Sequence, residues 1–529
     1  MKKHRILSLL LAMLLLASAL LTACGNESVA TTTAEAVTEE KKTEEVKKDA
    51  VSGQLHASDL ENIPKAKDSM SKTELRQIVM DYFKLQLSFH WLPGMDILDY
   101  PTTYSTTFKK NPKTLLSSGM YGGIPYQSLG SGNLYRWLEY YDEETAVLDF
   151  EKMFKENGGY GEGAAVTDVK TDENGVVTYQ KYRSFMALFN QCSASAFGGW
   201  GRVINSVNYG WTNQMTVRNG FIPVGLYDYG YEYNGEYYGV ERIDFFGEKT
   251  ENNPLGYDTT NVIRDLNAKN GENGMYQCYA QMKPGDLVVS PGHVMMIGDI
   301  FVITKTDGTP DYARSTATVL EQVEGWNEER VIQGKKYLQQ GRTAKNYTFK
   351  ELQKEGYIPF TFAEFLDEND PQDKKHLDYY NSMKEKLSVA ESRYTAFSFT
   401  REELEAMSGS GIEKAKVFTT LDTKKKSVEV SELENFAVGS NYAISDVFVT
   451  VKDKDGKELL KNIARSGQLY IHEVKADATL SNCKTDAEGK FLTLMNGIEE
   501  LANGKNKIEI TVQLWNGEKP VVYSGTLAK

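Results

Sequence analysis

The spacing of hydrophobic positions changes several times along this chain of 529 residues, and each change predicts a different kind of segment. An apolar run covers residues 6–21, and a stretch with almost no large apolar residues follows to about residue 51. Apolar residues then recur at helical spacing over residues 75–85, behind Ser71 and Glu74, which are placed as a capping box. We therefore expect a helix here that packs against the main folded region.

Alternating apolar and polar residues predict strands further along the chain. Residues 283–298 indicate two short strands around a Pro-Gly turn, with His293 first on the second strand. Residues 316–323 alternate in the same way, after a turn at Asp307-Gly308. At least three antiparallel strands are therefore expected in this region.

Short helical patterns follow these strands and cover residues 347–352, 362–367 and 374–388. The hydrophobic pattern changes near Lys416. From there on, short alternating segments predict a β-sandwich; they cover residues 427–430, 443–452, 468–474, 507–515 and 521–527. The acidic turn Asp453–Gly456 has no glutamate at calcium-hand spacing, so it indicates a hairpin and not a calcium loop.

A stretch of small residues, 194–203, predicts a helix that carries Cys192 at its first turn. The positive end of a helix dipole lowers the pKa of a thiol placed there. Gly198, Gly199 and Gly201 each cost a helix about 1 kcal/mol relative to alanine, so we expect this helix to pack closely on a sheet. Cys192 is therefore a candidate nucleophile that faces a neighbouring strand.

Composition changes this picture little, since 40% hydrophobic and 25% charged residues are ordinary for a soluble globular protein. A net charge of −13 argues against nucleic acid as a partner and against charge-driven docking on anionic lipid. No second histidine or carboxylate stands near His293 at metal-ligand spacing, so we expect no metal or other cofactor. The expected role of His293 is that of the general base that takes the thiol proton of Cys192.

A third side chain must orient the imidazole of His293. Asp299 has the right parity on the same strand, but six residues at about 3.3 Å each place it about 20 Å away. The next strand offers Glu321 and Gln322, and an antiparallel return brings one of them near His293. Because side chains alternate along a strand, only one of the two faces the site.

The start of the chain resembles a bacterial lipoprotein signal. Basic residues precede the apolar run, and Leu21-Thr22-Ala23-Cys24 closes it in the manner of a lipobox. The resemblance implies that residues 1–23 are a signal peptide, that Cys24 carries lipid, and that the protein is anchored to the outer face of a bacterial cell membrane. Residues 24–68 are expected to form a disordered tether.

Several short motifs resemble cysteine, histidine-dependent amidohydrolase/peptidase (CHAP) domains; they are Gln191-Cys192, Pro284–Leu287 with Gly292–Val294, and Val319–Gln322. In that family the glutamate orients the histidine, which implies this role for Glu321. The run Gly123–Tyr126 is similar to an element of the related NlpC-type cell-wall endopeptidases, which implies that Tyr126 helps to bind substrate.

The resemblance implies an α+β fold with a papain-like catalytic domain over residues 69–410, and the alternating strands place the β-sandwich over residues 411–529. In the catalytic domain, the helix that bears the cysteine packs on the antiparallel sheet that bears the histidine. The implied activity is cleavage of amide bonds in peptidoglycan, within stem peptides or between glycan and peptide. Cys192 would attack the carbonyl, its backbone N–H with Gln191 would stabilise the oxyanion, and Gln322 is a further candidate contact for substrate.

A second hypothesis is a non-catalytic surface lipoprotein that binds cell wall or a protein partner. Two departures from the families favour it: Val323 replaces an asparagine of CHAP domains, and the gap of 101 residues from Cys192 to His293 looks longer than usual. Gln191 in place of an aspartate of NlpC-type enzymes is a further departure. Cys278 lies apart from both motifs, and we expect a buried, inert thiol there. Since Cys192, Cys278 and Cys483 are widely spaced, no disulfide framework is expected. The oligomeric state is left open.

Overall fold

The structure is a computed structural model of the chain. It describes residues 53–100, 113–127, 130–157, 188–207, 217–225, 230–233, 236–239, 274–290, 292–324, 328–332, 335–387, 398–400, 415–465, 471–479 and 492–529, with isolated positions at 212, 215, 267, 271, 403 and 412. Everything described belongs to one compact unit, Ala50–Lys529. The predicted signal peptide, Cys24 and most of the predicted tether lie outside the described residues.

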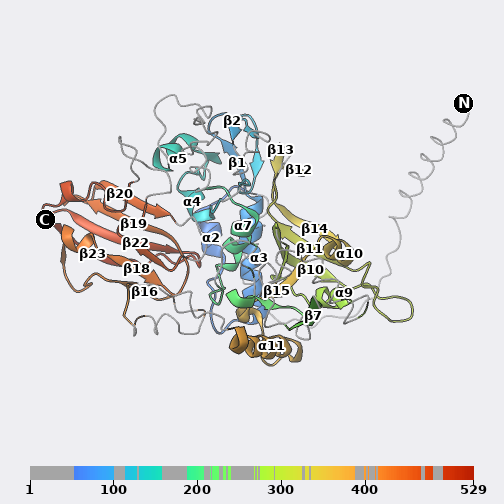
Figure 1. Cartoon of the computed structure of the whole chain (residues 1–529). Coiled ribbons are helices and arrows are strands. Elements are labelled where there is room, and N and C mark those ends of the chain that lie inside the picture. The colour runs from blue at the N-terminus through green and yellow to red at the C-terminus, as the bar shows by residue number, and fades with distance from the viewer. Residues whose placement is uncertain are drawn as a thin grey trace, which may run out of the picture. The chain divides into compact units, whose positions relative to one another are not determined.

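The unit mixes helices with several antiparallel sheets, so the α+β class is confirmed (Figure 1). Ordered structure begins before the predicted boundary at residue 69. Helix α2 (Ala57–Asn62) buries Leu60, and the flanking Leu55 and Ile63 join the same hydrophobic core. These apolar side chains are too few to give a helical period, which is why the sequence pattern did not reveal them.

Helix α3 (Lys72–Ser88) confirms the predicted helix and its capping box. The backbone N–H of Ser71 donates to the Glu74 carboxylate at 2.8 Å, and the N–H of Glu74 donates to Ser71 Oγ at 3.3 Å. These two bonds satisfy N–H groups that have no acceptor within the helix. The apolar face of α3 is buried in the main core.

A six-stranded sheet lies beside α3 and is antiparallel at every pairing. Its order is β14 (Arg342–Thr348), β11 (Thr316–Glu321), β10 (His293–Phe301), β9 (Leu287–Ser290), β15 (Ile358–Thr361) and β6 (Ile222–Pro223). The predicted strands of residues 283–298 and 316–323 are β9, β10 and β11, and His293 is the first residue of β10 as expected. The turn at Asp307-Gly308 is present too, with Gly308 at φ 84°.

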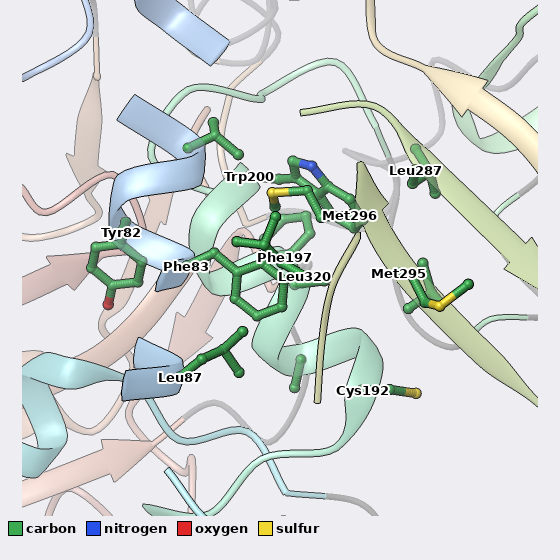
Figure 2. Close-up of a cluster of buried hydrophobic side chains, with 14 of the residues drawn as sticks. Tyr82, Phe83, Leu87, Cys192, Phe197, Trp200, Leu287, Met295, Met296 and Leu320 are labelled. Atoms are coloured by element: carbon green, nitrogen blue, oxygen red, sulfur yellow. The ribbon is translucent and has the colours of Figure 1, made fainter. Parts of the chain in front are cut away.

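Helix α7 (Cys192–Trp200) lies between α3 and this sheet, as Figure 2 shows. We expected its glycines to meet the sheet, but Gly198 and Gly199 mainly meet α3, and Gly201 at the C-cap meets Phe197 and Trp515. A Cβ atom added to Gly198 would lie 2.5 Å from Gln86 Oε1, and one added to Gly199 would lie 2.8 Å from the Val79 carbonyl oxygen. The sheet contributes Met296 at 3.3 Å from the latter position. The glycines therefore allow two helices to approach each other closely.

The remaining elements of the first 400 residues frame this core. A five-stranded sheet has the order β12 (Glu328–Ile332), β13 (Lys335–Gln339), β4 (Tyr121–Gly122), β1 (His90–Pro93) and β5 (Val147–Leu148). Two further pairs are β2 (Ile97–Tyr100) with β3 (Lys113–Leu115), and β7 (Gly230–Tyr233) with β8 (Glu236–Gly239). The helices are α4 (Leu134–Leu138), α5 (Phe150–Asn157), η4 (Val217–Asn219), α9 (Gly274–Tyr279), α10 (Phe349–Lys354), η6 (Ala363–Phe365) and α11 (Pro371–Leu387). The last three confirm the short helical patterns predicted after the strands.

The C-terminal strands build a separate hydrophobic core. Five strands have the order β17 (Ser427–Glu429), β23 (Val521–Ala528), β22 (Lys507–Leu514), β19 (Ile444–Lys452) and β20 (Glu458–Arg465); three more have the order β16 (Val417–Thr419), β18 (Ala437–Ser440) and β21 (Glu473–Lys475). Two short helices, α13 (Val430–Leu433) and η9 (Glu499–Leu501), accompany them. The Asp453–Gly456 segment turns between β19 and β20, with Gly456 at φ 87°, so the predicted hairpin is confirmed.

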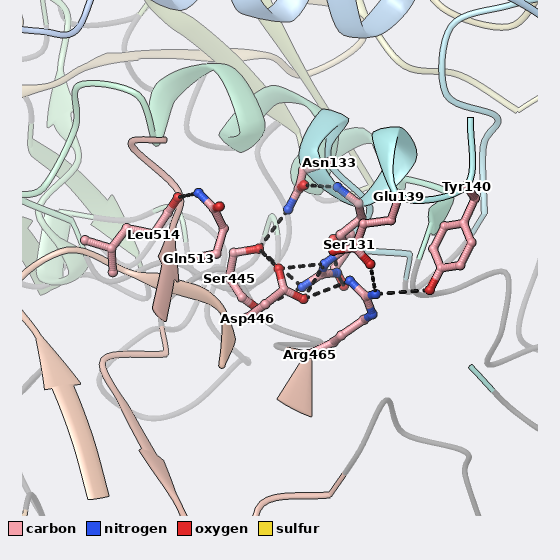
Figure 3. Close-up of polar contacts among 10 residues, drawn as sticks. Ser131, Asn133, Glu139, Tyr140, Ser445, Asp446, Arg465, Gln513 and Leu514 are labelled. Carbon is pink, nitrogen blue, oxygen red and sulfur yellow. Dashed lines mark hydrogen bonds and ion pairs between the residues drawn. The ribbon is translucent and has the colours of Figure 1, made fainter. Parts of the chain in front are cut away.

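A buried ion network links β19 and β20 to α4 (Figure 3). Asp446 accepts from Arg136 and from Arg465, each at 3.0 Å, and Arg465 also pairs with Glu139 at 2.5 Å. Arg136 in turn donates to the Ser131 carbonyl at 2.7 Å. The network thus holds the C-terminal strands against the chain segment around α4.

In the described part of the chain, no helix is long and apolar enough to cross a membrane.

Candidate active site

Cys192 is the first residue of α7, with Gln191 as the N-cap. It lies at the edge of the core cluster, and Figure 2 shows its sulfur pointing away from that cluster. Burial by itself raises the pKa of this thiol, but the hydrogen bond and the charge of His293 outweigh burial and lower it. Backbone N–H groups of Val294 and Ser193 act in the same direction. The site therefore favours the thiolate, which is the nucleophilic form of cysteine.

His293 approaches the thiol from the start of β10, where it pairs in register with Ser290 of β9. Its Nε2 lies 2.9 Å from Glu321 Oε2, so Nδ1 is the ring nitrogen left for Cys192. Burial lowers the pKa of His293, but the hydrogen bonds to Cys192 and Glu321 outweigh it and raise the pKa to about 10. An imidazolium beside a thiolate is the resting form that these shifts favour.

The structure places Glu321, and not Gln322, on the imidazole. Glu321 ends β11 and has a side chain 1% exposed, while Gln322 points elsewhere and donates from Nε2 to the Ile124 carbonyl at 3.0 Å. Side chains alternate along a strand, so only one of the two could face His293; the sequence did not show which one. Asp299 lies at the far part of β10, opposite Thr318, away from His293.

Tyr126 lies next to the nucleophile. Its backbone bridges Asn190, two residues before Cys192, and its N–H donates to the side chain of Gln340. Burial raises the pKa of Tyr126, and the nearby charges of Cys192 and Glu324 raise it further. Gln322 contacts the backbone of the same segment at Ile124, so it supports the segment that carries Tyr126 and does not face the imidazole.

Gln191 was expected to help stabilise an oxyanion. Its backbone N–H donates to the Gly130 carbonyl at 3.4 Å, so this N–H already has an acceptor. Its side chain is half-buried and forms no cap hydrogen bond with α7. The side-chain amide is therefore the part of Gln191 that remains available next to the N–H of Cys192, which as a first-turn group has no acceptor within the helix.

Two residues of the site were missed by the sequence analysis. Arg342 Nη1 lies 2.8 Å from Glu321 Oε1, and the Tyr347 hydroxyl lies 3.5 Å from the same oxygen. Both come from β14, which pairs with β11 so that Arg342 lies opposite Glu321. The charged and polar residues of β14 gave no clear strand pattern, so nothing in the sequence set this register.

Cys278 is a buried thiol of a different kind, as expected. Its sulfur donates to the Gly225 carbonyl at 3.2 Å and to the Gly274 carbonyl at 3.4 Å. Burial raises the pKa of Cys278 to about 12, which is opposite in direction to the shift of Cys192.

Among the described residues, no three His, Cys, Asp or Glu side chains are grouped so that they could hold a metal ion.

Comparisons with family models, with curated proteins and with solved structures find no match for this chain. The indications of function are therefore the geometry of Cys192, His293 and Glu321 and the resemblance of short motifs.

Proposed function

We propose that this protein is a cysteine hydrolase that cleaves amide bonds in peptidoglycan. The observation that carries the proposal is the arrangement of Cys192 at a helix start, His293 on the adjoining strand and Glu321 on His293 Nε2. It has the three parts of an activated nucleophile, in which the base accepts the thiol proton and a third group orients the base. We further propose that residues 69–410 are a papain-like domain of CHAP or NlpC type, and that the C-terminal strands form a β-sandwich.

The chemistry follows from the charges at the site. The Cys192 thiolate attacks the carbonyl carbon, and the backbone N–H of Cys192 faces the oxyanion that forms. The His293 imidazolium gives its proton to the leaving nitrogen as the C–N bond breaks, which leaves a thioester on Cys192. His293 then takes a proton from water as the water oxygen attacks the thioester carbonyl carbon. The C–S bond breaks, the carboxylic acid product leaves, and the Cys192 thiolate and His293 imidazolium are restored.

Two features favour peptidoglycan as the substrate: the lipoprotein-like signal at the start of the chain, and the segment around Tyr126. A lipid on Cys24 and a tether would hold the enzyme beside the cell wall, outside a bacterial membrane. The segment around Tyr126, which resembles that of cell-wall endopeptidases, supports the same substrate because it adjoins Cys192. Both stem-peptide and glycan-peptide amides fit this chemistry.

The test is digestion of purified peptidoglycan by the mature chain, with mass analysis of the soluble products. The wild type is expected to release fragments with new amino groups, and Cys192→Ala is expected to lower the rate by about 10⁴-fold or more. Cys278→Ala is a matched control that removes a buried thiol outside the site and is expected to keep activity. If wild type and Cys192→Ala give the same products, the enzyme proposal fails and the non-catalytic binding protein becomes the better account.

A further inference from the structure

The carboxylate of Glu321 is held on both sides. Its Oε2 lies 2.9 Å from His293 Nε2, and its Oε1 lies 2.8 Å from Arg342 Nη1. Glu321 itself is 1% exposed, whereas the side chain of Arg342 is 24% exposed. The guanidinium therefore closes the solvent side of a carboxylate that the sheet otherwise buries.

The four groups form a row across adjoining elements. Cys192 is on α7, His293 on β10, Glu321 on β11 and Arg342 on β14, which is the edge strand of the sheet. A register shift between Val319 and Glu321 interrupts the ladder just before Arg342. Such irregularities turn side chains away from the regular alternation, and here the result is that Arg342 meets Glu321.

This row matters because the charge of His293 changes during the reaction. When the imidazolium has given up its proton, Glu321 has no cation left on Oε2, and a buried carboxylate without a cation draws protons to itself. A guanidinium does not release its proton at working pH. Arg342 therefore keeps Glu321 ionised and fixed in both states of His293.

We propose that Arg342 is a positioning residue of this active site, which acts through Glu321 to fix the imidazole of His293 and to sustain the thiolate of Cys192. The proposal rests on the proposed function only in taking Cys192 as the nucleophile. Arg342 thus supplies a second anchor for the carboxylate that holds the base.

Other titratable groups lie near Cys192 and His293. Tyr126 and Glu324 lie on the Cys192 side. Tyr347 contacts Glu321 from β14. Tyr357, close to Glu355, directly precedes β15. The ring of Tyr357 meets that of His293 edge to face at 6.5 Å. Among these groups, the carboxylates would oppose a thiolate, and the tyrosines are neutral at neutral pH, so Arg342 supplies the positive charge on this side.

The test follows alkylation of Cys192 by iodoacetamide as a function of pH, read out on the Cys192 peptide by mass spectrometry. This probe needs no substrate, so its result is separate from whether peptidoglycan is cleaved. Arg342→Gln is expected to move the inflection of the alkylation rate upward by roughly 0.5–1 pH unit, because Glu321 loses the cation that keeps it ionised and fixed on His293. Arg342→Lys keeps the charge and is expected to recover most of the shift.

Two controls make the outcome decisive. Lys345→Gln removes an equal charge from an exposed position of the same strand and is expected to leave the inflection unchanged. In a Glu321→Gln background, Arg342→Gln is expected to have little further effect, since Arg342 acts through Glu321. The proposal is overturned if Arg342→Gln gives the wild-type profile. If Arg342→Gln does not fold, Arg342→Met, which keeps the apolar stem and removes the charge, takes its place, and a wild-type alkylation profile for that variant overturns the proposal.

Discussion

Glu321 and Asp446 are two buried carboxylates held by similar contacts, yet their surroundings differ in one respect. Each is 1% exposed and accepts from two basic side chains. Both partners of Asp446 are arginines, whose side chains are at most 3% exposed. One partner of Glu321 is His293, which is 22% exposed and adjoins a thiol. Glu321 therefore has a titratable partner that solvent can reach, which the proposed chemistry requires and which Asp446 lacks.

The charges around Asp446 do not change near neutral pH. Burial raises the pKa of Asp446, but Arg136 and Arg465 outweigh burial and hold it low. Arginine stays protonated in proteins, so this network joins parts of the fold and moves no proton. Around Glu321, by contrast, one partner is a histidine that can release its proton, and under the proposed function His293 gives that proton to the leaving nitrogen.

The largest expected effect is at the titratable partner. His293→Ala removes the base and the cation beside Cys192, and we expect the rate of peptidoglycan cleavage to fall by about 10⁴-fold or more, or roughly 5 kcal/mol in barrier. The free energy of unfolding is expected to change far less. A variant that keeps a tenth of wild-type activity would show that His293 is not the base.

Asp446→Ala is expected to lower the stability of the fold and to leave the chemistry of the site alone. It leaves Arg136 and Arg465 buried without a carboxylate, which typically costs about 3–5 kcal/mol of stability, measured by urea unfolding. Asp455→Ala is the matched control, since Asp455 is exposed in the turn that joins β19 to β20; such changes stay within about 0.5 kcal/mol. Equal effects of the two variants would contradict the structural role of the network.

Glu321→Gln keeps the shape of the side chain and removes its charge. We expect kcat to fall by about 10²-fold through loss of orientation. The carboxylate helps to raise the pKa of His293 to about 10, so its loss lowers that pKa. The alkaline limb of the activity profile, where the imidazolium loses its proton, should therefore move to lower pH. A limb that stays in place would mean that Glu321 does not set the protonation of His293.

Gly199→Ala tests the scaffold that presents Cys192. The added carbon would lie 2.8 Å from the Val79 carbonyl oxygen and 3.0 Å from Phe83 Cβ, so overpacking by about 1–3 kcal/mol should exceed the roughly 1 kcal/mol gain in helix propensity. Gly53→Ala adds the same carbon where no atom lies within 4 Å. A rise in melting temperature for Gly199→Ala would show that the two helices are not closely packed.

Local patterns in the sequence predicted the parts of the site that depend on neighbouring residues. The capping box of α3, the cysteine at the start of α7 and the histidine at the start of β10 are all local features. Strand alternation reduced the third member to two residues but did not choose between them. That choice depends on the register of β11 against β10 and on a bulge, which only the folded sheet determines.

Features that depend on tertiary pairing were missed. Strand β20 (Glu458–Arg465) has no clean alternation and is defined by its pairing with β19. Arg342 meets Glu321 only because β14 pairs with β11. The glycines of α7 predicted close packing but not its partner, since nothing in the sequence indicated that α3 would lie against them. Long-range contacts of this kind leave little trace in one sequence.

The most direct test of the account is the ultraviolet titration of the Cys192 thiolate, taken as the difference in absorbance between wild type and Cys192→Ala. We predict that the thiolate is already formed at neutral pH, with an inflection below the value of about 8.5 of a free cysteine. A thiolate that forms only at or above that value would contradict it, because Cys192 would then be an ordinary buried thiol like Cys278.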